Sequence, residues 1–152
     1  AAPLELARHR QRRQPWLNVV FQQGDALSTG LPDASADGIV MAYGLRNLAD
    51  PAAGLKEMAR LLKPGRRAGV LDFNRLTTAG PAADFQRFYL RRLVVPAASA
   101  AGLKEEYAYL EESLKGFPDG TAQERLALEA GFAEASHHTL VAGQMGMLLL
   151  KR

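Results

Sequence analysis

The chain has 152 residues, 47% of them apolar, which is enough to build the core of one compact domain over residues 1–152. The formal charge is +3, and four of the fourteen arginines crowd the first thirteen residues. Neither aromatic interleaving nor zinc-ligand spacing accompanies them, so nucleic-acid binding is not expected. Cysteine is absent, which excludes disulfides, thiolate metal sites and cysteine nucleophiles.

Short apolar runs alternate with helical patterns along the chain, and Gly, Pro or Asp bounds each of them, as is typical of an α/β sheet. A first helix is expected over Leu4–Gln14, before Pro15, and a short strand over Leu17–Gln22. Asp37–Tyr43 is apolar without alternation. This pattern predicts a central strand that is covered on both faces of a parallel sheet.

The best-defined helix is predicted after Asp50, whose carboxylate can cap it, and before Lys63-Pro64-Gly65, which stops it. Its apolar face consists of Leu55, Met58, Leu61 and Leu62. The next strand is expected over Arg67–Phe73, with Asp72 near its carboxyl end, where the chemistry of α/β proteins is usually found.

Two amphipathic helices are expected in the second half of the chain, from Phe85 to Leu93 and over Lys104–Leu114. A third opens at the capping-box sequence Thr121-Ala-Gln-Glu124 and ends at Gly131. Ala135–Val141 and Gly146–Lys151 flank a short glycine turn, so they are predicted to form an antiparallel hairpin that ends the sheet.

The stretch Ala42-Tyr43-Gly44-Leu45-Arg46-Asn47 resembles the ubiquinone and menaquinone biosynthesis methyltransferases of the UbiE type. The similarity continues through residues 55–65, 70–74, 106–110 and 129–132. Arg66 and Asp72 stand where the family pattern has a glycine and a glutamate. With residues 72–74, 94–98 and 143–146, these departures look more like the cyanobacterial and chloroplast branch, which methylates demethylphylloquinone.

The resemblance implies a class I (Rossmann-like) methyltransferase fold, a sheet of seven strands in the order 3-2-1-4-5-7-6 that binds S-adenosyl-L-methionine. Leu17–Gln22 would be strand three, followed by strands four to seven with the C-terminal antiparallel hairpin. The family loop after strand one is glycine-rich, yet this sequence contains no Gly-x-Gly pair. We therefore expect an incomplete α/β sheet, the C-terminal part of a methyltransferase domain, lacking strands one and two.

Such a sheet leaves an apolar edge, which invites pairing with another chain. We expect either a homodimer joined through strand four or strand three, or a missing amino-terminal half that the natural protein has. The opening residues Ala-Ala-Pro-Leu-Glu, without an initiating methionine, are interpreted as an internal cut.

The resemblance also implies cofactor contacts. Asp25 and Ala26 follow strand three, where a carboxylate and a backbone amide would meet the edge of adenine, although a plain Gly-Asp turn is the alternative. Ala42, Tyr43 and Gly44 lie where strand four passes beneath the cofactor, and small residues there permit close approach. Ordinary packing at the end of a strand is the alternative for these three residues.

Arg46 and Asn47 are the expected catalytic pair, because two strongly polar residues at a strand's carboxyl end must be solvated, paired or functional. Arg46 cannot accept a proton at neutral pH, so it would stabilise a phenolate or orient a water molecule that takes the proton. Asn47 would position the ring oxygen. The alternative is a salt bridge from Arg46 to Asp50 or Asp72.

The function implied is transfer of a methyl group from S-adenosyl-L-methionine to a ring carbon of a prenylated quinol, such as demethylphylloquinol. The alternative is a catalytically inert, truncated α/β module that dimerises through exposed sheet edges. A nicotinamide-binding fragment would share the sheet type but should show a glycine fingerprint, which this sequence lacks.

No metal is expected, because His9, His137 and His138 lack ligand partners at useful spacing. Aromatic residues between Phe85 and Leu110 either line a tunnel for the prenyl tail or pack in the core. The expected location is the chloroplast for a plant or algal protein and the cytoplasm for a bacterial one, with at most peripheral membrane contact.

Overall fold

The computed structural model describes residues 2–14, 18–75, 113–114, 116–141 and 143–152. The two helices expected over Phe85 to Leu93 and Lys104–Leu114 fall almost wholly on residues 76–112, outside the described residues. Within the described residues, the elements in chain order are helix α1 (Ala2–Arg13), strand β1 (Ala36–Ala42), the 3-10 helix η1 (Leu45–Asn47), helix α2 (Pro51–Leu61), strand β2 (Leu62–Phe73), helix α6 (Gly120–Glu129), strand β3 (Glu134–Leu140) and strand β4 (Met145–Lys151).

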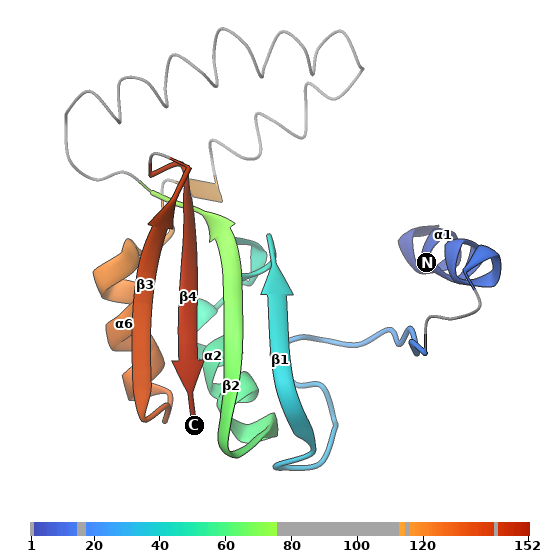
Figure 1. The fold of residues 1–152 in the computed structure, drawn as a ribbon, viewed down its shortest axis with the longest axis horizontal. Helices are drawn as coiled ribbons and strands as arrows, with labels where there is room; N and C mark the ends of the chain where they lie inside the picture. Colours follow the sequence, from blue (N-terminus) through green and yellow to red (C-terminus); the bar gives the residue numbers. More distant parts are fainter. Residues whose placement is uncertain (1, 15–17, 76–112, 115, 142) are drawn as a thin grey trace, which may run out of the picture.

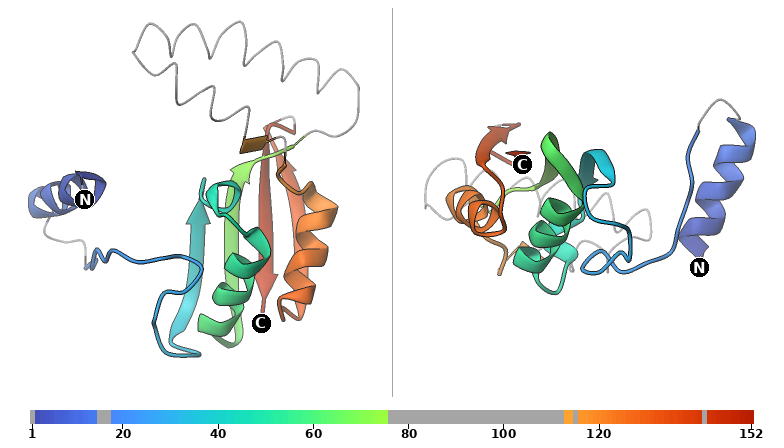
Figure 2. Two further views of the ribbon diagram at one scale, coloured as in Figure 1. Left: turned by 180° about the vertical axis from the view of Figure 1, so that it is seen from behind. Right: turned by 90° about the horizontal axis from the view of Figure 1, so that it is seen from below.

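The four described strands form one sheet in the order β1-β2-β4-β3 (Figure 1). β1 runs parallel to β2, and β4 runs antiparallel to both β2 and β3. The predicted hairpin is therefore confirmed. Figure 2 shows that α2 and α6 cover the same face of the sheet.

The core lies between the sheet and these two helices. Ala68 and Val70 of β2 and Leu148 and Leu150 of β4 alternate with residues of the opposite face, and all four are buried. They pack in one cluster with the apolar face of α2, whose Leu55 is fully buried. Each buried Leu or Val side chain contributes about 1.5–3 kcal/mol relative to an exposed one.

The capping signals of α2 are those predicted. The Asp50 carboxylate accepts a hydrogen bond from the Ala53 amide at 3.1 Å, and Pro51 opens the first turn. The helix ends at Leu61, and Leu62, predicted on its apolar face, is the C-cap. β2 begins at Leu62 rather than at the predicted Arg67, and its pairing with β1 is irregular before Arg67. Gly65 in this irregular part has a φ of +74°, a conformation that glycine takes more readily than other residues.

The predicted capping box of α6 is wrong. The helix begins at Gly120, one residue before Thr121, and its N-cap is Asp119, whose carboxylate accepts a hydrogen bond from the Ala122 amide at 2.9 Å. Glu124 instead uses its carboxylate to accept the amide of His137 in β3 at 2.6 Å. The predicted end at Gly131 is confirmed: this glycine has a φ of +105°, and its amide donates back into the last turn.

Two predictions about the other edge of the sheet are wrong. β1 is an edge strand rather than a central one, and Val40 at its middle is 91% exposed. Residues 18–24 form no strand, although Leu17–Gln22 was predicted to be one. A strand needs a neighbour for its backbone groups. Here the carbonyls of Val19 and Phe21 instead accept side-chain hydrogen bonds from α1, which lies away from the sheet (Figures 1 and 2).

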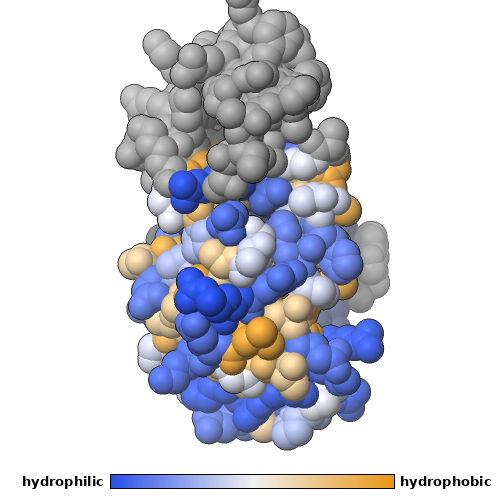
Figure 3. Space-filling model, turned by 90° about the vertical axis from the view of Figure 1, so that its left-hand side faces the viewer, coloured by the Kyte–Doolittle hydropathy of each residue, from blue (hydrophilic) through white to orange (hydrophobic). Residues whose placement is uncertain are grey.

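The two edges of the sheet differ in character. β3 alternates outward polar residues such as Glu134, Ser136 and His138, and Figure 3 shows the β3 and α6 side as mainly hydrophilic. Polar edge strands discourage pairing with other chains, whereas the apolar β1 edge does not.

Among the described residues, no helix combines the length and apolarity needed to cross a membrane.

Candidate functional site

The turn that leaves β1 holds most of the predicted site residues. Ala42 ends the strand opposite Leu71, and the Tyr43 amide extends the pairing by donating to the Leu71 carbonyl at 2.7 Å. Tyr43 has a φ of +56°, which is strained for a bulky residue. A Cβ atom on Gly44 would lie 2.9 Å from Cγ of Met41. Any side chain at position 44 would therefore have to displace that of Met41.

Arg46 and Asp72 form an ion pair at the carboxyl ends of β1 and β2. Nη1 of Arg46 lies 2.6 Å from Oδ1 of Asp72, and the backbone amide of Arg46 donates to Oδ2 at 3.1 Å. The Asp72 side chain is 4% exposed and that of Arg46 is 11% exposed. The salt bridge weighed from the sequence is thus present with Asp72, while Asp50 caps α2. A charge-assisted pair so removed from water fixes the guanidinium firmly.

This ion pair leaves part of the guanidinium unused. Nε of Arg46 is buried and has no hydrogen-bond partner among the described residues. Nη1 of Arg46 and Nδ2 of Asn47 both donate to the Tyr43 carbonyl, at 3.3 and 3.0 Å. The guanidinium carbon lies 5.3 Å from the centre of the Phe73 ring, which in turn lies 5.4 Å from the Tyr43 ring. The result is a fixed cation beside an aromatic surface.

Asp25 and Ala26 lie in a tight turn, which is the alternative considered from the sequence. Oδ1 of Asp25 accepts the Leu27 amide at 2.9 Å, and the Asp25 carbonyl accepts the Ser28 amide at 3.1 Å. The turn uses neither Oδ2 of Asp25 nor the amide of Ala26. Both residues line a shallow cavity of about 260 Å³, together with residues 22, 24, 29 and 31.

Apolar packing connects this turn to the turn after β1. Leu27 and Leu48 both approach Gly54 at the start of α2, where a Cβ atom would lie 2.3 Å from Cδ1 of Leu48. Among the described residues, no hydrogen bond or ion pair joins Asp25 or Ala26 to residues 42–47. The two groups of predicted residues therefore share one side of α2 without direct polar contact.

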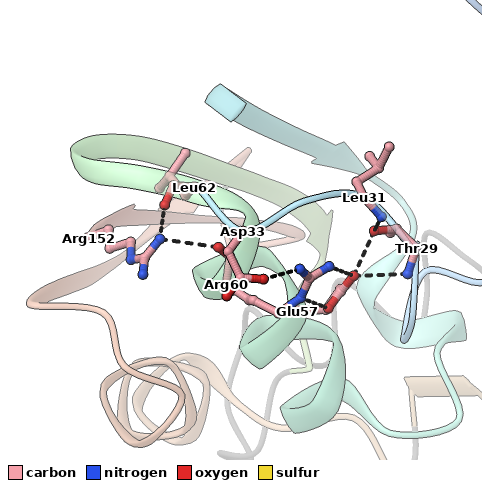
Figure 4. Close-up of polar contacts among 7 residues, drawn as sticks. All are labelled: Thr29, Leu31, Asp33, Glu57, Arg60, Leu62 and Arg152. Atoms are coloured by element: carbon pink, nitrogen blue, oxygen red, sulfur yellow. Dashed lines mark hydrogen bonds and ion pairs between the residues drawn. The ribbon is translucent and has the colours of Figure 1, made fainter. Parts of the chain in front are cut away.

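Sequence reasoning missed a second polar cluster, centred on Glu57 (Figure 4). The carboxylate of Glu57 accepts hydrogen bonds from the amide and hydroxyl of Thr29 at 2.9 and 2.7 Å and from two nitrogens of Arg60 at 2.8 Å. Arg60 also pairs with Asp33, and its carbonyl accepts a bond from Arg152. The signal available was a glutamate and an arginine spaced i, i+3 on a largely apolar helix.

The contacts of Glu57 lower its pKa to about 2, chiefly through the hydrogen bonds from Arg60 and then those from Thr29. The hydrogen bonds of Arg60 to Glu57 and then to Asp33 raise the pKa of Arg60. All of these groups tie the loop before β1 to α2 and to the end of the chain. The cluster therefore holds the fold together, and its Thr29 also lines the cavity beside Asp25 and Ala26.

The adjacent histidines point to opposite faces of β3, as a strand requires. The His137 ring fits between Gly120 and Gly146, where added Cβ atoms would approach within 2.3 and 2.2 Å of it. Burial lowers the pKa of His137. Among the described residues, no group of three or more His, Asp or Glu side chains could hold a metal ion.

Solved methyltransferases share this fold. The S-adenosylmethionine-dependent methyltransferase of Aquifex aeolicus has a TM-score of 0.62 at 17% identity, covering 97% of this chain and 62% of that one. The CurJ carbon methyltransferase has a TM-score of 0.62 at 15% identity, covering 95% of this chain and 38% of that one. The class is therefore the Rossmann-like α/β fold of methyltransferases.

The chain belongs to the ubiE/COQ5 methyltransferase family, whose sequence profile matches residues 1–149. It is 48% identical over 136 residues to the 2-phytyl-1,4-naphtoquinone methyltransferase of Synechocystis sp., covering 90% of this chain and 57% of that protein. The identity is 42% over 150 residues to the protein of that name from Nostoc punctiforme, covering 98% and 65%. For the chloroplastic 2-phytyl-1,4-beta-naphthoquinone methyltransferase of Arabidopsis thaliana it is 41% over 134 residues, covering 88% and 51%. The chain thus spans between half and two thirds of the length of these relatives.

Proposed function

We propose that this chain is part of an S-adenosylmethionine-dependent C-methyltransferase whose substrate is a prenylated 1,4-naphthoquinol such as demethylphylloquinol. Family membership and the names of relatives at 41–48% identity support the reaction and the substrate class. The observation that carries the proposal is the buried guanidinium of Arg46, held by Asp72 beside Phe73 and Tyr43. A preorganised cation beside an aromatic surface suits a ring that develops negative charge on oxygen.

We further propose that β1, β2, β4 and β3 correspond to strands four, five, seven and six of the family sheet, and that strands one and two lie outside this chain. The matching strand order and the absence of a Gly-x-Gly pair support this assignment. The exposed β1 edge would then be covered by those strands or, in their absence, by the β1 edge of a second copy in a homodimer.

The described residues fit the adenosine end of the cofactor. Oδ2 of Asp25 and the Ala26 amide, both unused by their turn, would read the edge of adenine at the 260 Å³ cavity. Ala42, Tyr43 and Gly44 would lie beneath the cofactor, since their turn leaves no large side chain at position 44. None of these residues is proposed to contact the methionine end of the cofactor. We assign the contact with that end to strand one and its loop.

When bound, S-adenosylmethionine supplies an electrophilic methyl group that replaces a ring hydrogen of the quinol, leaving S-adenosylhomocysteine and a proton. Arg46 stabilises the phenolate once the ring hydroxyl has lost its proton to water, because a guanidinium cannot accept that proton. Asp72 positions Arg46 through the 2.6 Å ion pair. Asn47, whose Oδ1 accepts no hydrogen bond from the described residues, orients the ring hydroxyl.

The proposed location rests on the names of the relatives, and the proposed membrane contact rests on the chemistry of the substrate. We propose a chloroplast location if the source is a plant or alga, by analogy with the chloroplastic Arabidopsis thaliana protein, and a cytoplasmic one if it is bacterial. A prenylated substrate resides in membranes, so peripheral membrane contact is proposed as well.

Methyl transfer by the full-length gene product tests the function. The assay follows mass gain in reduced demethylphylloquinone from S-adenosylmethionine with a deuterated methyl group. Arg46→Ala should lower kcat by about 100-fold or more, while the Kd for S-adenosylhomocysteine stays within about twofold. An unchanged rate would assign Arg46 to structure alone. Calorimetry of the 152-residue chain with S-adenosylhomocysteine shows whether it retains binding, and absence of heat would favour the inert module.

A further inference from the structure

Thr29 belongs both to the cavity beside Asp25 and to the polar cluster centred on Glu57. It lines that cavity of about 260 Å³ together with Asp25 and Ala26. Its amide and hydroxyl also donate to Oε1 of Glu57, at 2.9 and 2.7 Å (Figure 4). The wall of the proposed adenine cavity is therefore connected to α2 through Thr29.

This connection is the polar attachment of the turn that residues 25–31 form. Among the described residues, the other hydrogen bonds of the turn stay within it. The Leu27 amide donates to the Asp25 carboxylate at 2.9 Å, and the Leu31 amide donates to Oγ1 of Thr29 at 3.3 Å. Leu27 adds an apolar approach to the start of α2. The position of the turn against the helix therefore depends strongly on the two bonds from Thr29.

Glu57 is a firm anchor for this attachment. Its side chain is 9% exposed, and two nitrogens of Arg60 donate to its carboxylate at 2.8 Å. Hydrogen bonds to an ionised group are about twice as strong as those between neutral groups. Leu55 and Met58, on the same helix, are buried in the core. The core therefore fixes Glu57, and Thr29 transmits that position to the turn.

We propose that Thr29 is a positioning residue for the cofactor: by holding the turn against Glu57, it keeps Asp25 and Ala26 in the arrangement that reads adenine. This inference rests on the proposed function. A turn that already has the binding geometry does not have to be ordered when the ligand arrives. If the attachment is lost, the apparent Kd rises by the factor by which the binding-competent fraction of the protein falls.

Thr29→Val in the full-length gene product tests the role, because valine keeps the shape of threonine but lacks the hydroxyl donor. The Kd for S-adenosylhomocysteine, measured by calorimetry, should rise about tenfold. The KM for S-adenosylmethionine should rise with it, while kcat at saturating cofactor and the KM for the quinol stay within about twofold. Thr29→Ser keeps the hydroxyl and should restore the Kd to within about twofold of that of the unaltered protein.

Asp33→Ala is the matched control, because it removes a partner of the same cluster that does not line the cavity. Asp33 pairs with Arg60, and its side chain is 76% exposed. This variant should leave the Kd for S-adenosylhomocysteine within about twofold. An unchanged Kd in Thr29→Val, or an equal rise in Asp33→Ala, overturns the proposal.

Hydrogen exchange of the unaltered protein gives a second test that does not depend on a variant that folds. The Thr29 amide should already be protected without ligand, and S-adenosylhomocysteine should add little to that protection. An amide that exchanges freely until the ligand binds would show that the turn is not held in advance, which overturns the proposal. If the unaltered full-length protein binds no S-adenosylhomocysteine, the proposed function fails as well.

Discussion

Two buried carboxylates in this protein each pair with an arginine, yet their surroundings differ. Glu57 accepts four hydrogen bonds, and each side-chain nitrogen of its partner Arg60 donates to Glu57 or Asp33. Asp72 also accepts several bonds, but its partner Arg46 donates only from Nη1 and the backbone, and its Nε stays unpaired among the described residues.

This difference separates a structural role from a functional one. A cluster whose donors are all satisfied within the chain gains nothing from a ligand, whereas an unsatisfied buried donor does. The Glu57 cluster joins three segments of the chain, while the Arg46 pair lies at the strand ends beside an aromatic surface. Similar carboxylate–arginine pairs therefore perform different tasks, and the donors that remain without a partner distinguish the two.

Glu57→Gln should give the largest loss of stability. It removes one charge from a pair and breaks an acceptor set, so we expect the free energy of unfolding to fall by about 2 kcal/mol in urea titration. Because the folded pKa of Glu57 is about 2, its contribution is present above about pH 4.5 and is lost as pH falls toward 2. The variant should lack that acid dependence. Full retention of stability would remove the basis for calling the cluster structural.

Asp119→Ala should have a smaller effect, about 1 kcal/mol, because it removes one N-cap hydrogen bond from α6. Thr121→Ala is the control at the position that the sequence pattern favoured, and it should change the unfolding free energy by less than about 0.5 kcal/mol. If Thr121→Ala lowered the unfolding free energy more than Asp119→Ala in thermal or urea unfolding, the capping box predicted from the sequence would be supported instead.

His137 should give the smallest effect, visible as pH dependence. Burial lowers its pKa in the folded state, so between that pKa and about 6.5 the unfolded chain binds more protons than the folded one. Its contribution to stability is therefore intact above about pH 6.5 and lost as pH falls through the folded pKa. Glu124 and Asp119 oppose this shift, and His138 adds to it.

The corresponding measurement is the unfolding midpoint between pH 7.5 and 5. His137→Gln should flatten the dependence, whereas His138→Gln, on the exposed face, should preserve most of it. Equal slopes in both variants would show that His137 does not sense its glycine-lined position.

Local signals in the sequence predicted much of this fold. Asp50, Pro51 and Gly65 act within a few residues of themselves, so α2 and its ends were predictable, as was the β3–β4 hairpin around Gly143. The position of β1 at the edge of the sheet and the absence of a strand at residues 18–24 were not predictable, because strand pairing depends on partners far away in the chain or outside it. The polar and aromatic groups around Arg46 needed coordinates, since Asp72 and Phe73 reach it from β2 whereas Tyr43 lies in the turn after β1.

The predicted site divides in the same way. The sequence singled out Arg46 and named Asp72 among its alternatives, because residue type and position at a strand end are local facts. Whether Nε of Arg46 finds a hydrogen-bond partner depends on how the side chains pack, which the spacing of residues in the sequence does not reveal.

The most direct test of the contrast exchanges each arginine for lysine, which keeps the charge but loses the planar fork. In the full-length gene product, Arg46→Lys should lower kcat for methyl transfer by about tenfold or more with little change in unfolding free energy. Arg60→Lys should lower the unfolding free energy by about 1 kcal/mol and leave kcat unchanged. If both variants lose stability alone, or both lose turnover alone, the two arginines share one role and the account is contradicted.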